Sequence, residues 1–335
     1  MEKGRKNVLM ICPGFFGYRE AIAREIENLG FSVDVYDERL EGGFWAKAMI
    51  RLNCRLYYPV IEKYYRRIVA ENRHKDYDYI FVVKGEAITP RVMQQLRQTW
   101  PRAEFVLYLW DSVKNVPQGQ TRLGWYDRVL TFDPEDAKAY GLQFRPLFFS
   151  REFSGIPSGG EDTYAVAFIG TAHSIRPWVI HQLTQQCQSL GKKIFAYQYC
   201  PYPAVYWKGV LTNRNFRYLK PSQVHYTPLS KEEIREIYSK SSCVLDVEHV
   251  QQTGLTMRTI ELVGMGKKII TTNFRVREYD FYDPNNIYIL DKDEPWLDPA
   301  FLEAQYRPIP GEIRQRYSIE AFVRDIFNVR ERYEN

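Results

Sequence analysis

The stretch NVLMICPGFFGYREAIAREIENLGFSVDVYD, residues 7–37, decides the fold. Its apolar run Val8–Cys12 predicts a buried strand, and a turn with Pro13 and Gly14 follows it. A helical period comes next, before Gly30 as a plausible helix end; its apolar stripe is Ala21, Ile22, Ile26 and Leu29. FSVDVYD then predicts a second strand. Strand, helix and strand in this order form a βαβ unit, which implies a parallel sheet.

The same pattern returns at YAVAFIGTAHSIRPWVIHQLTQQCQSLGKKIFAY, residues 164–197. Between the two patterns, residues 145–163 are rich in Gly, Ser and Pro and make the best linker. A length of 335 residues favours two domains. We therefore predict an α/β protein with two Rossmann-like domains, whose parallel sheets face each other across a cleft. The predicted domains are 1–155 and 156–315, and a C-terminal helix at 316–335 packs back on the first.

The composition is that of a folded globular protein, with 45% hydrophobic and 26% charged residues. These values exclude a disordered chain, a collagen and a coiled coil. No apolar run approaches the roughly 18 residues that cross a bilayer, and we interpret the N-terminal apolar run as the first buried strand instead of a secretory leader. The five cysteines are scattered without a CxxC pair. Free thiols in a reducing compartment, the cytoplasm, are therefore expected.

Residues 44–75 hold eight Lys or Arg and two Glu, a charge of +6, while the rest of the chain sums to −1. We expect a helix here, interrupted at Pro59. Lys47, Arg51 and Arg55 form one basic stripe beside apolar positions. Such a face can lie weakly on an anionic membrane, where lipid-linked acceptors reside, as a peripheral contact. The alternative is a solvated helix face that covers the first domain. No nucleic-acid-binding module is visible, so nucleic acid is not an expected partner.

The strongest local signal is QQTGLTMRTIELVGMGKKIITTN, residues 251–273. A turn at Gly254, Leu255 and Thr256 enters a helix whose N-terminus offers free N–H groups and a positive dipole end to a diphosphate. Arg258 can add a bidentate contact, and Glu261, one turn further on, can accept hydrogen bonds from ribose hydroxyls. The alternative is a plain amphipathic helix in which Arg258 and Glu261 form an ion pair.

A second cluster of polar residues follows the first strand of the second domain in FIGTAHSIRP, residues 168–177. Ligands of open α/β sheets bind beyond the carboxyl ends of the strands. Gly170 permits a close approach of backbone to ligand. Thr171, His173 and Arg176 carry donors that suit a phosphate at the start of the next helix. A structural role for His173 is the alternative, because a lone histidine is more often structural.

The combination of GLTMRTIE, FIGTAHSIRP and YLWDS resembles the CgeB-like bacterial glycosyltransferases of the GT-B class, encoded in polysaccharide loci. The resemblance covers nearly the whole chain. It implies transfer of a sugar from a nucleotide-sugar donor, a co-substrate, to a glycan or lipid-linked saccharide acceptor in the synthesis of surface polysaccharide such as lipopolysaccharide or capsule. It places the donor on the second domain and the acceptor on the first. A nucleotide-sugar epimerase of the same fold, or a catalytically silent nucleotide-sugar or glycan-binding protein, is the alternative.

The resemblance also bears on stereochemistry and metal use. Glu261 matches the ribose-binding Glu that closes the Glu-x7-Glu motif of many retaining members, but the position of the first Glu is Thr253 here. We therefore favour inversion weakly. No cofactor or metal is expected, because the helix dipole, Arg258 and the 170–176 loop can neutralise the leaving diphosphate. The acidic run at 291–294 is interpreted as a charged loop.

An inverting transfer needs a base that takes the proton of the acceptor hydroxyl. Glu86 and Asp111 follow strands that we expect to be close in the first sheet, and Lys84 can orient them or tune their pKa. We favour Glu86 as the base and Asp111 as the residue that organises the site. The alternative for Glu86 is a solvated loop carboxylate, and the alternative for Asp111 is a turn residue.

The Gly-rich turn CPGFFGYRE, residues 12–20, supplies the predicted acceptor-binding residues. Phe15, Phe16 and Tyr18 suit stacking on a sugar ring, and Arg19 suits an anionic acceptor. The alternative is a loop that packs on the core.

Overall fold

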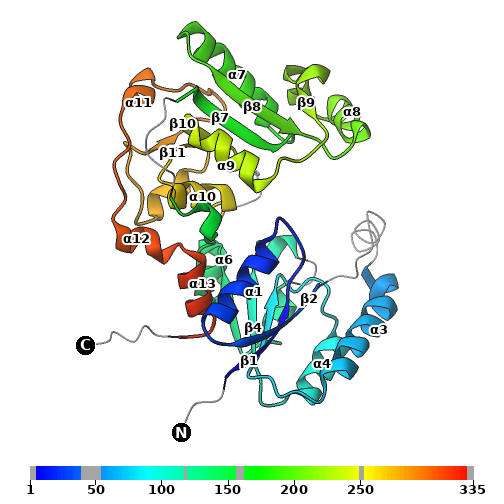
Figure 1. Ribbon diagram of the computed structural model, residues 1–335. Helices are drawn as coiled ribbons and strands as arrows, with labels where there is room; N and C mark the ends of the chain where they lie inside the picture. The colour runs from blue at the N-terminus through cyan, green and yellow to red at the C-terminus, as the bar shows by residue number, and fades with distance from the viewer. Residues whose placement is uncertain (1–4, 39–53, 117–118, 156–161, 249–252, 330–335) are drawn as a thin grey trace, which may run out of the picture. The chain divides into compact units, whose positions relative to one another are not determined.

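The structure is a computed structural model that describes residues 5–38, 54–116, 119–155, 162–248 and 253–329. The chain divides into two compact units, Met1–Pro146 with Ile319–Asn335, and Leu147–Ser318. Each unit is an α/β layer structure around its own parallel sheet (Figure 1).

The first unit contains a six-stranded parallel sheet in the order β2-β1-β3-β4-β5-β6. The strands are β1 (Asn7–Ile11), β2 (Ser32–Tyr36), β3 (Tyr79–Val83), β4 (Glu104–Leu109), β5 (Arg128–Thr131) and β6 (Gln143–Phe144). Its helices are α1 (Tyr18–Asn28), α3 (Cys54–Asn72), α4 (Pro90–Thr99), α5 (Gly119–Leu123), α6 (Pro134–Tyr140) and α13 (Ile319–Ile326), with a 3₁₀ turn η1 (Val113–Asn115). The strand order reverses between β1 and β3, which is where open sheets bind their ligands.

Local signals in the sequence explain several of these helix ends. Gly30 follows α1 with φ 83°, as a left-handed position after a helix requires. Thr89 caps α4 by accepting a hydrogen bond from the N–H of Val92, and Pro90 occupies the first helical position. The predicted helix end at Gly30 is confirmed.

The predicted interruption at Pro59 is wrong. Helix α3 runs through Pro59 from Cys54 to Asn72. An interior proline costs a helix about 3 kcal/mol, and the helix tolerates it because its apolar face, which includes Ile61, Tyr65 and Ile68, is buried in the core. Lys47 and Arg51 of the predicted basic stripe lie outside the described residues, and the side chain of Arg55 is not described either.

The second unit contains a six-stranded parallel sheet in the order β12-β11-β10-β7-β8-β9. The strands are β7 (Tyr164–Thr171), β8 (Ile194–Tyr199), β9 (Val224–His225), β10 (Ser241–Asp246), β11 (Lys268–Thr271) and β12 (Ile287–Ile289). Its helices are α7 (Arg176–Ser189), α8 (Pro203–Thr212), α9 (Lys231–Ser239), α10 (Met257–Met265), α11 (Pro299–Glu303) and α12 (Gly311–Arg316). Short 3₁₀ turns η2 (Arg151–Phe153), η3 (Arg214–Tyr218), η4 (Pro221–Gln223) and η5 (Phe274–Glu278) complete it. The strand order reverses between β7 and β10.

The boundary between the units falls at 146/147, whereas the sequence analysis placed it at 155/156. Residues 147–155 belong to the second unit because they are bonded to it. The N–H of Phe149 donates to the carbonyl of Tyr317 at 2.8 Å, and the N–H of Gly155 donates to the carbonyl of Gly264 at 2.9 Å.

The C-terminal segment from Ile319 belongs to the first unit. Helix α13 contacts α1, and its Phe322 packs edge-on against Tyr108 with ring centroids 4.7 Å apart. Asp325 pairs with the Nε of Arg145 at 2.7 Å.

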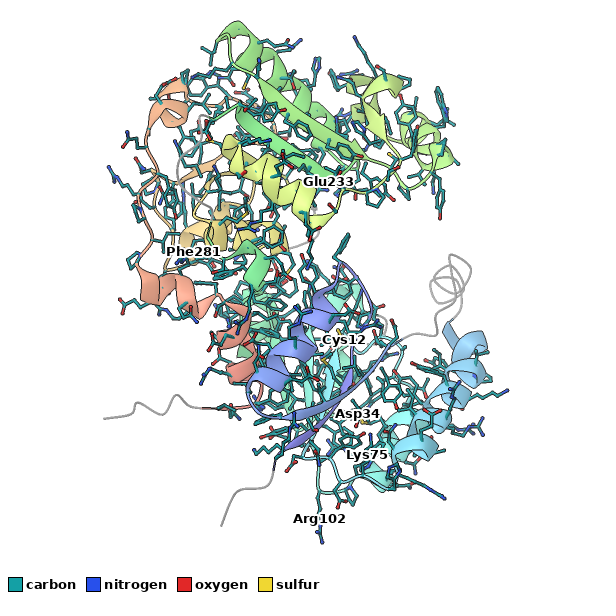
Figure 2. The ribbon with its side chains drawn as sticks, viewed as in Figure 1. Cys12, Asp34, Lys75, Arg102, Glu233 and Phe281 are labelled. Carbon is teal, nitrogen blue, oxygen red and sulfur yellow. The ribbon has the colours of Figure 1, made fainter. Side chains whose placement is uncertain are left out.

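The described cysteines Cys12, Cys187, Cys200 and Cys243 are free and buried, as the sequence predicts. Figure 2 shows Cys12 just past the end of β1, and Asp34 beside Lys75, with which it forms a 2.7 Å ion pair. Within the described part of the chain, no helix combines the length and the apolar character that crossing a bilayer demands.

Candidate functional site

Arg176 joins the two strands at which the second sheet reverses. It begins α7, and its side chain reaches the loops that follow β7 and β10. Its Nη1 donates to the carbonyl of Thr171 at 3.0 Å, and its Nε and Nη2 donate to the carbonyl of Val247 at 2.9 and 2.7 Å. The guanidinium therefore fixes both loops, and these bonds go to neutral carbonyls that leave its charge in place.

Arg258 lies at the same reversal point but is neutralised by a carboxylate. Its Nη1 pairs with Oδ1 of Asp246 at 3.0 Å, and its Nη2 donates to the carbonyl of Ile169. The other oxygen of Asp246 accepts hydrogen bonds of 2.6 Å from the hydroxyls of Thr256 and Thr259. Asp246 is only 1% exposed. This network places the N-terminus of α10 against the end of β10. Arg258 therefore has a structural role in addition to its candidate role in binding a ligand.

Arg258 is paired with Asp246 and also lies in the field of the Glu261 carboxylate. The hydrogen bonds of Arg176 go to backbone carbonyls instead. Burial, and then the charge of Arg258, lower the pKa of Arg176 to about 9, so a positive charge is disfavoured at this position. An anion bound here would relieve that cost. The cluster of Arg176, Arg258 and Asp246, hereafter the arginine cluster, therefore suits a phosphate group.

Glu248 stands two residues beyond β10 and is a candidate that the sequence analysis did not select. Burial, and then the charge of Asp246, raise the pKa of Glu248 to about 7. Its Oε2 is buried and has no hydrogen-bond partner among the described residues. A carboxyl that is partly protonated near neutral pH can donate a hydrogen bond to an anion. The signal that could have found it is its position just beyond the end of a strand.

Gly170 makes room for the arginine cluster. A Cβ at this position would lie 2.8 Å from Nη2 of Arg258 and 3.4 Å from Nη1 of Arg176. The sequence analysis assigned Gly170 to a close approach of the ligand. The structure gives a nearer reason, because the two guanidinium groups already fill that space.

The loop after β7 is held in a strained conformation. Ser174 has a φ of 51°, and its carbonyl accepts hydrogen bonds from the side chains of Asn213 and Asn215 at 2.8 and 3.2 Å. The Nδ1 of His173 lies 3.1 Å from the hydroxyl of Ser174. This loop therefore presents Thr171 and His173 at the end of β7 in a fixed position.

The other donor residues predicted on α10 are largely internal. Thr256 caps the helix by accepting from the N–H of Thr259 at 3.2 Å. The side chain of Leu255 is buried, Gly254 is buried, and Glu261 is only 7% exposed. The helix N-terminus is thus correctly predicted, and Glu261 lies mostly inside the unit.

In the first unit, the three predicted catalytic side chains converge. Strands β3 and β4 are paired, which confirms that the strands ending near Glu86 and Asp111 are neighbours. The Nζ of Lys84 lies 2.9 Å from Oε1 of Glu86 and 3.7 Å from Oδ2 of Asp111. Asp111 also serves its own turn, since its Oδ1 accepts from the N–H of Ser112 and the side chain of Asn115. The lysine can therefore hold both carboxylates in one place.

An aromatic cluster stands beside these carboxylates. Phe15 lies edge-on to Trp110 with ring centroids 5.0 Å apart, and Tyr18 lies 5.7 Å from the same ring. Phe16 is 77% exposed, whereas Tyr18 is buried. The sequence analysis did not select Trp110, although it directly precedes Asp111 at the end of β4. Phe16 is thus the most accessible of the predicted acceptor residues.

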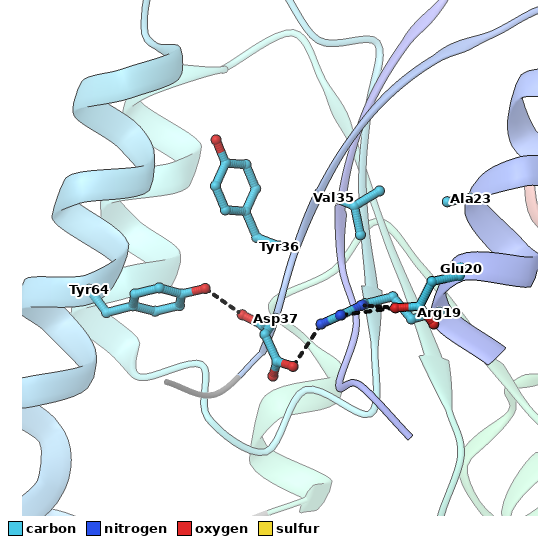
Figure 3. Close-up of a pocket in the computed structure, with 7 residues that line it drawn as sticks. All are labelled: Arg19, Glu20, Ala23, Val35, Tyr36, Asp37 and Tyr64. Carbon is cyan, nitrogen blue, oxygen red and sulfur yellow. Dashed lines mark hydrogen bonds and ion pairs between the residues drawn. The ribbon is translucent and has the colours of Figure 1, made fainter. Parts of the chain in front are cut away.

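Arg19 lies in a separate hollow of about 540 Å³ beside the edge strand β2 (Figure 3). Its Nη1 pairs with Asp37 at 2.8 Å and its Nη2 with Glu20 at 2.9 Å. Two carboxylates therefore surround this guanidinium, and local charge gives no preference for an anionic acceptor. The hollow is lined by Arg19, Glu20, Ala23, Val35, Tyr36, Asp37 and Tyr64.

Backbone strain gathers at the same strand ends. Among the described residues, four that are not glycine have a positive φ: Phe16, Lys84, Ser174 and Asn328. The first three follow β1, β3 and β7, the strands nearest the two reversal points. Left-handed backbone at such residues commonly marks a functional position.

No group of three or more His, Cys, Asp and Glu side chains in the described ranges is arranged to hold a metal ion. The acidic run at 291–294 is a loop, in which Asp291 accepts from the N–H groups of Asp293 and Glu294.

No family model matches this sequence, and no curated protein matches it. Solved structures do share its fold over almost the whole chain. The α,α-trehalose-phosphate synthase (UDP-forming) from Burkholderia xenovorans, in complex with glucose-6-phosphate, is 12% identical with a TM-score of 0.65 and covers 96% of this chain and 100% of its own. HepE from Anabaena, in complex with UDP-glucose, is 10% identical with a TM-score of 0.59 over 96% of this chain and 98% of its own.

A protein from Listeria monocytogenes assigned as a UDP-N-acetylglucosamine 2-epimerase is 12% identical, with a TM-score of 0.50 over 99% of both chains. Identities this low show the fold alone. The predicted fold is confirmed: the chain is built from two Rossmann-like units with parallel sheets, as in the glycosyltransferases of the GT-B class.

Proposed function

We propose that this chain is a glycosyltransferase that moves a sugar from a nucleotide-sugar donor to a saccharide acceptor. The arginine cluster carries the proposal. It combines the buried guanidinium of Arg176 and the half-buried guanidinium of Arg258 with the carboxylate of Asp246. The cluster lies at the point where the second sheet reverses, which is where Rossmann-type sheets bind nucleotides. The fold likeness to proteins solved with UDP-glucose or named as UDP-forming supports a nucleotide sugar as the ligand.

The donor diphosphate is proposed to bind at the arginine cluster. Arg176 keeps a charge that the carbonyls of Thr171 and Val247 do not neutralise. The N-terminus of α10 adds N–H groups and a positive dipole end beside it. When the bond between the anomeric carbon and the diphosphate breaks, these groups stabilise the charge on the leaving oxygen. No step in this scheme uses a metal.

The acceptor is proposed to bind at the carboxyl edge of the first sheet. Glu86 takes the proton of the acceptor hydroxyl while the oxygen of that hydroxyl attacks the anomeric carbon. The configuration at the anomeric carbon inverts. Lys84, at 2.9 Å, holds the Glu86 carboxylate, and Asp111 fixes the other side of Lys84. The exposed ring of Phe16 offers a face for a sugar.

We further propose the narrower assignment that the motifs imply: a CgeB-like enzyme of surface polysaccharide synthesis in the bacterial cytoplasm, with a glycan or lipid-linked acceptor. Weak contact of residues 44–75 with an anionic membrane belongs to this proposal.

A thermal-shift screen of CMP-, UDP-, GDP- and dTDP-linked sugars tests the donor site. We expect one nucleotide to raise the melting temperature, and Arg176→Lys to reduce the rise, since lysine keeps the charge but loses the fork that reaches both carbonyls. The matched control is Arg277→Lys, an exposed arginine of the same unit. If no nucleotide raises the melting temperature, the proposal fails.

A nucleotide-sugar epimerase is the second candidate, because an epimerase assignment exists among the solved structures of this fold. Incubation with the donor that binds separates the possibilities. Release of free nucleotide with slow hydrolysis supports a transferase, and an epimerised nucleotide sugar supports the alternative. Binding without either reaction supports a silent binding protein.

A further inference from the structure

Helix α8 (Pro203–Thr212) is apolar on nearly every side, yet only Tyr206 among its residues is buried. Its sequence PAVYWKGVLT contains one charged residue, Lys208. Trp207 is 55% exposed and Leu211 is 85% exposed. A helix on the surface of a soluble domain normally turns polar residues outward. The outer face of α8 therefore has the composition of a buried surface.

The orientation of α8 is fixed by its inner side. The hydroxyl of Tyr206 donates to the carbonyl of Leu219 at 3.0 Å. Gly209 faces Phe216 so closely that a Cβ would lie 2.4 Å from its ring. Trp207 and Leu211 are one turn apart, and the Trp207 ring stays 55% exposed although its edge-on contact with Tyr206 brings the ring centroids to 5.1 Å. The helix cannot rotate to bury them without losing these contacts.

The chain around α8 is entirely free of acidic residues. No Asp or Glu occurs between Asp162 and Glu232, while this stretch contains eight Lys or Arg. Around α8 itself, the basic side chains are exposed and form no ion pair within the described residues; they are Lys208, Arg214, Arg217 and Lys220. Val205 and Val210 are further exposed apolar side chains of the helix, and the exposed rings of Tyr202 and Tyr226 border it. α8 lies beside β9 at one edge of the second sheet (Figure 1).

We propose that α8 and its basic border dock this chain onto an anionic lipid bilayer. Aromatic and aliphatic side chains with basic neighbours are what a helix needs to lie in the headgroup region. Tryptophan and tyrosine favour this depth because each ring combines an apolar body with a polar atom. The lysines and arginines meet lipid phosphates, and each contributes about a five-fold gain in binding near an anionic surface.

Charge also selects this occupant against a second copy of the chain. Two copies joined through α8 would bring at least four positive charges of each together without a carboxylate from this region, which is unfavourable. A bilayer supplies negative charge and an apolar layer at once. Docking through α8 would be independent of residues 44–75 and would bring the chain to the surface where lipid-linked saccharides reside.

Co-sedimentation of the full chain with vesicles tests the proposal. The vesicles are phosphatidylcholine alone, or phosphatidylcholine mixed with phosphatidylserine. We expect binding to the mixed vesicles only, and a loss of at least about ten-fold when Trp207→Ser and Leu211→Ser are combined. Both side chains are exposed, so the fold should persist, which circular dichroism checks. Trp296→Ser, another exposed tryptophan of the second unit, is the control and should bind as the unchanged protein does.

Three results would overturn the proposal. The double variant could sediment with vesicles as well as the unchanged protein. Binding could instead vanish only when Lys47, Arg51 and Arg55 are replaced by glutamine, which would assign the contact to residues 44–75. Finally, the protein could ignore vesicles and self-associate in a way that the double variant abolishes, which would make α8 an interface between copies.

Discussion

Replacing Gly170 by alanine tests whether the arginine cluster is the part of the second unit that binds an anion. The new Cβ would lie 2.8 Å from Nη2 of Arg258 and 3.1 Å from Cζ of Phe168. The φ of Gly170 lies outside the left-handed region, so alanine adds no backbone strain there. The substitution changes no charge and removes no hydrogen-bonding group. Its main effect comes from displacing the Arg258 guanidinium, with a smaller displacement of the Phe168 ring.

The size of the effect follows from the contacts of Arg258. The guanidinium must retreat by roughly 0.6 Å to restore ordinary contact, and it is held by Asp246 and by the carbonyl of Ile169. A hydrogen bond to a charged group is worth about 1.5–3 kcal/mol, and overpacking of a core costs about 1–3 kcal/mol. We expect the free energy of unfolding of the second unit to fall by about 2 kcal/mol. If the cluster binds the nucleotide, affinity should fall by about ten-fold or more.

Urea denaturation measures the first quantity, and titration calorimetry with the nucleotide that binds measures the second. Gly311→Ala is the matched control, because its Cβ would meet nothing within 4 Å and its φ is ordinary. The control should leave nucleotide affinity unchanged and raise the free energy of unfolding by at most about 1 kcal/mol, because alanine restricts the unfolded chain more than glycine does. A Gly170→Ala protein that is less stable but binds nucleotide as before would show that the arginine cluster is structural only, and the donor-site assignment would be refuted.

Three further predictions follow from other parts of the sites. Glu86→Gln should lower turnover by about 10²-fold or more with donor affinity intact, while Asp111→Asn should lower it less; steady-state kinetics with wild-type turnover in both would exclude these carboxylates. Because burial raises the pKa of Glu248 from 4.5 to about 7, the folded state keeps a proton between these pH values that the unfolded state has lost. The free energy of unfolding should therefore fall as the pH rises from 4.5 to about 7, and level off above that. After discounting for partial exposure the loss is about 1–2 kcal/mol, and denaturation of Glu248→Gln at several pH values should show no such fall. Phe16→Gly should raise the free energy of unfolding by about 1 kcal/mol by removing a left-handed phenylalanine, yet weaken acceptor binding; Phe16→Ala keeps the backbone cost, and equal stability of the two variants would contradict the argument.

The elements of the fold could be predicted because their signals are local. The Thr89 cap, the proline at position 90 and the left-handed Gly30 each act within a few residues. Pro59 misled the prediction because a local cost was outweighed by burial of the α3 face against the sheet. The order of the strands could not be predicted. The two βαβ patterns look alike, yet the strand order reverses after β1 and β2 in one sheet and after β7, β8 and β9 in the other.

The positions of the sites could be predicted, but the chemical state of their residues could not. Strand ends identify Lys84, Glu86 and Arg258 as candidates by position alone. Arg258 has a carboxylate partner because Asp246, the last residue of β10, lies beside it. In the sequence, Asp246 appears only as the end of a predicted strand. The total charge of the chain also hides a site, because it does not reveal the basic stretch around α8. The basic stretch around α8 is cancelled in the total by acidic residues elsewhere, and only its position in the fold shows that its charges gather beside exposed apolar residues.

The two candidate sites share one backbone feature: each contains residues with a left-handed conformation. Phe16, Lys84 and Ser174 each hold a left-handed backbone, which costs about 1–2 kcal/mol at a residue with a Cβ. Glycine at any of these positions would remove the cost, and Gly85, directly after Lys84, shows that glycine is used in this region. Each side chain does work that glycine could not: the ammonium of Lys84 reaches two carboxylates, and the hydroxyl of Ser174 contacts His173. Phe16 alone has a ring that is mostly in solvent. The packing of this exposed ring does not offset the cost of the left-handed backbone. Among the three strained residues, Phe16 is therefore the one best explained by a role in binding a ligand.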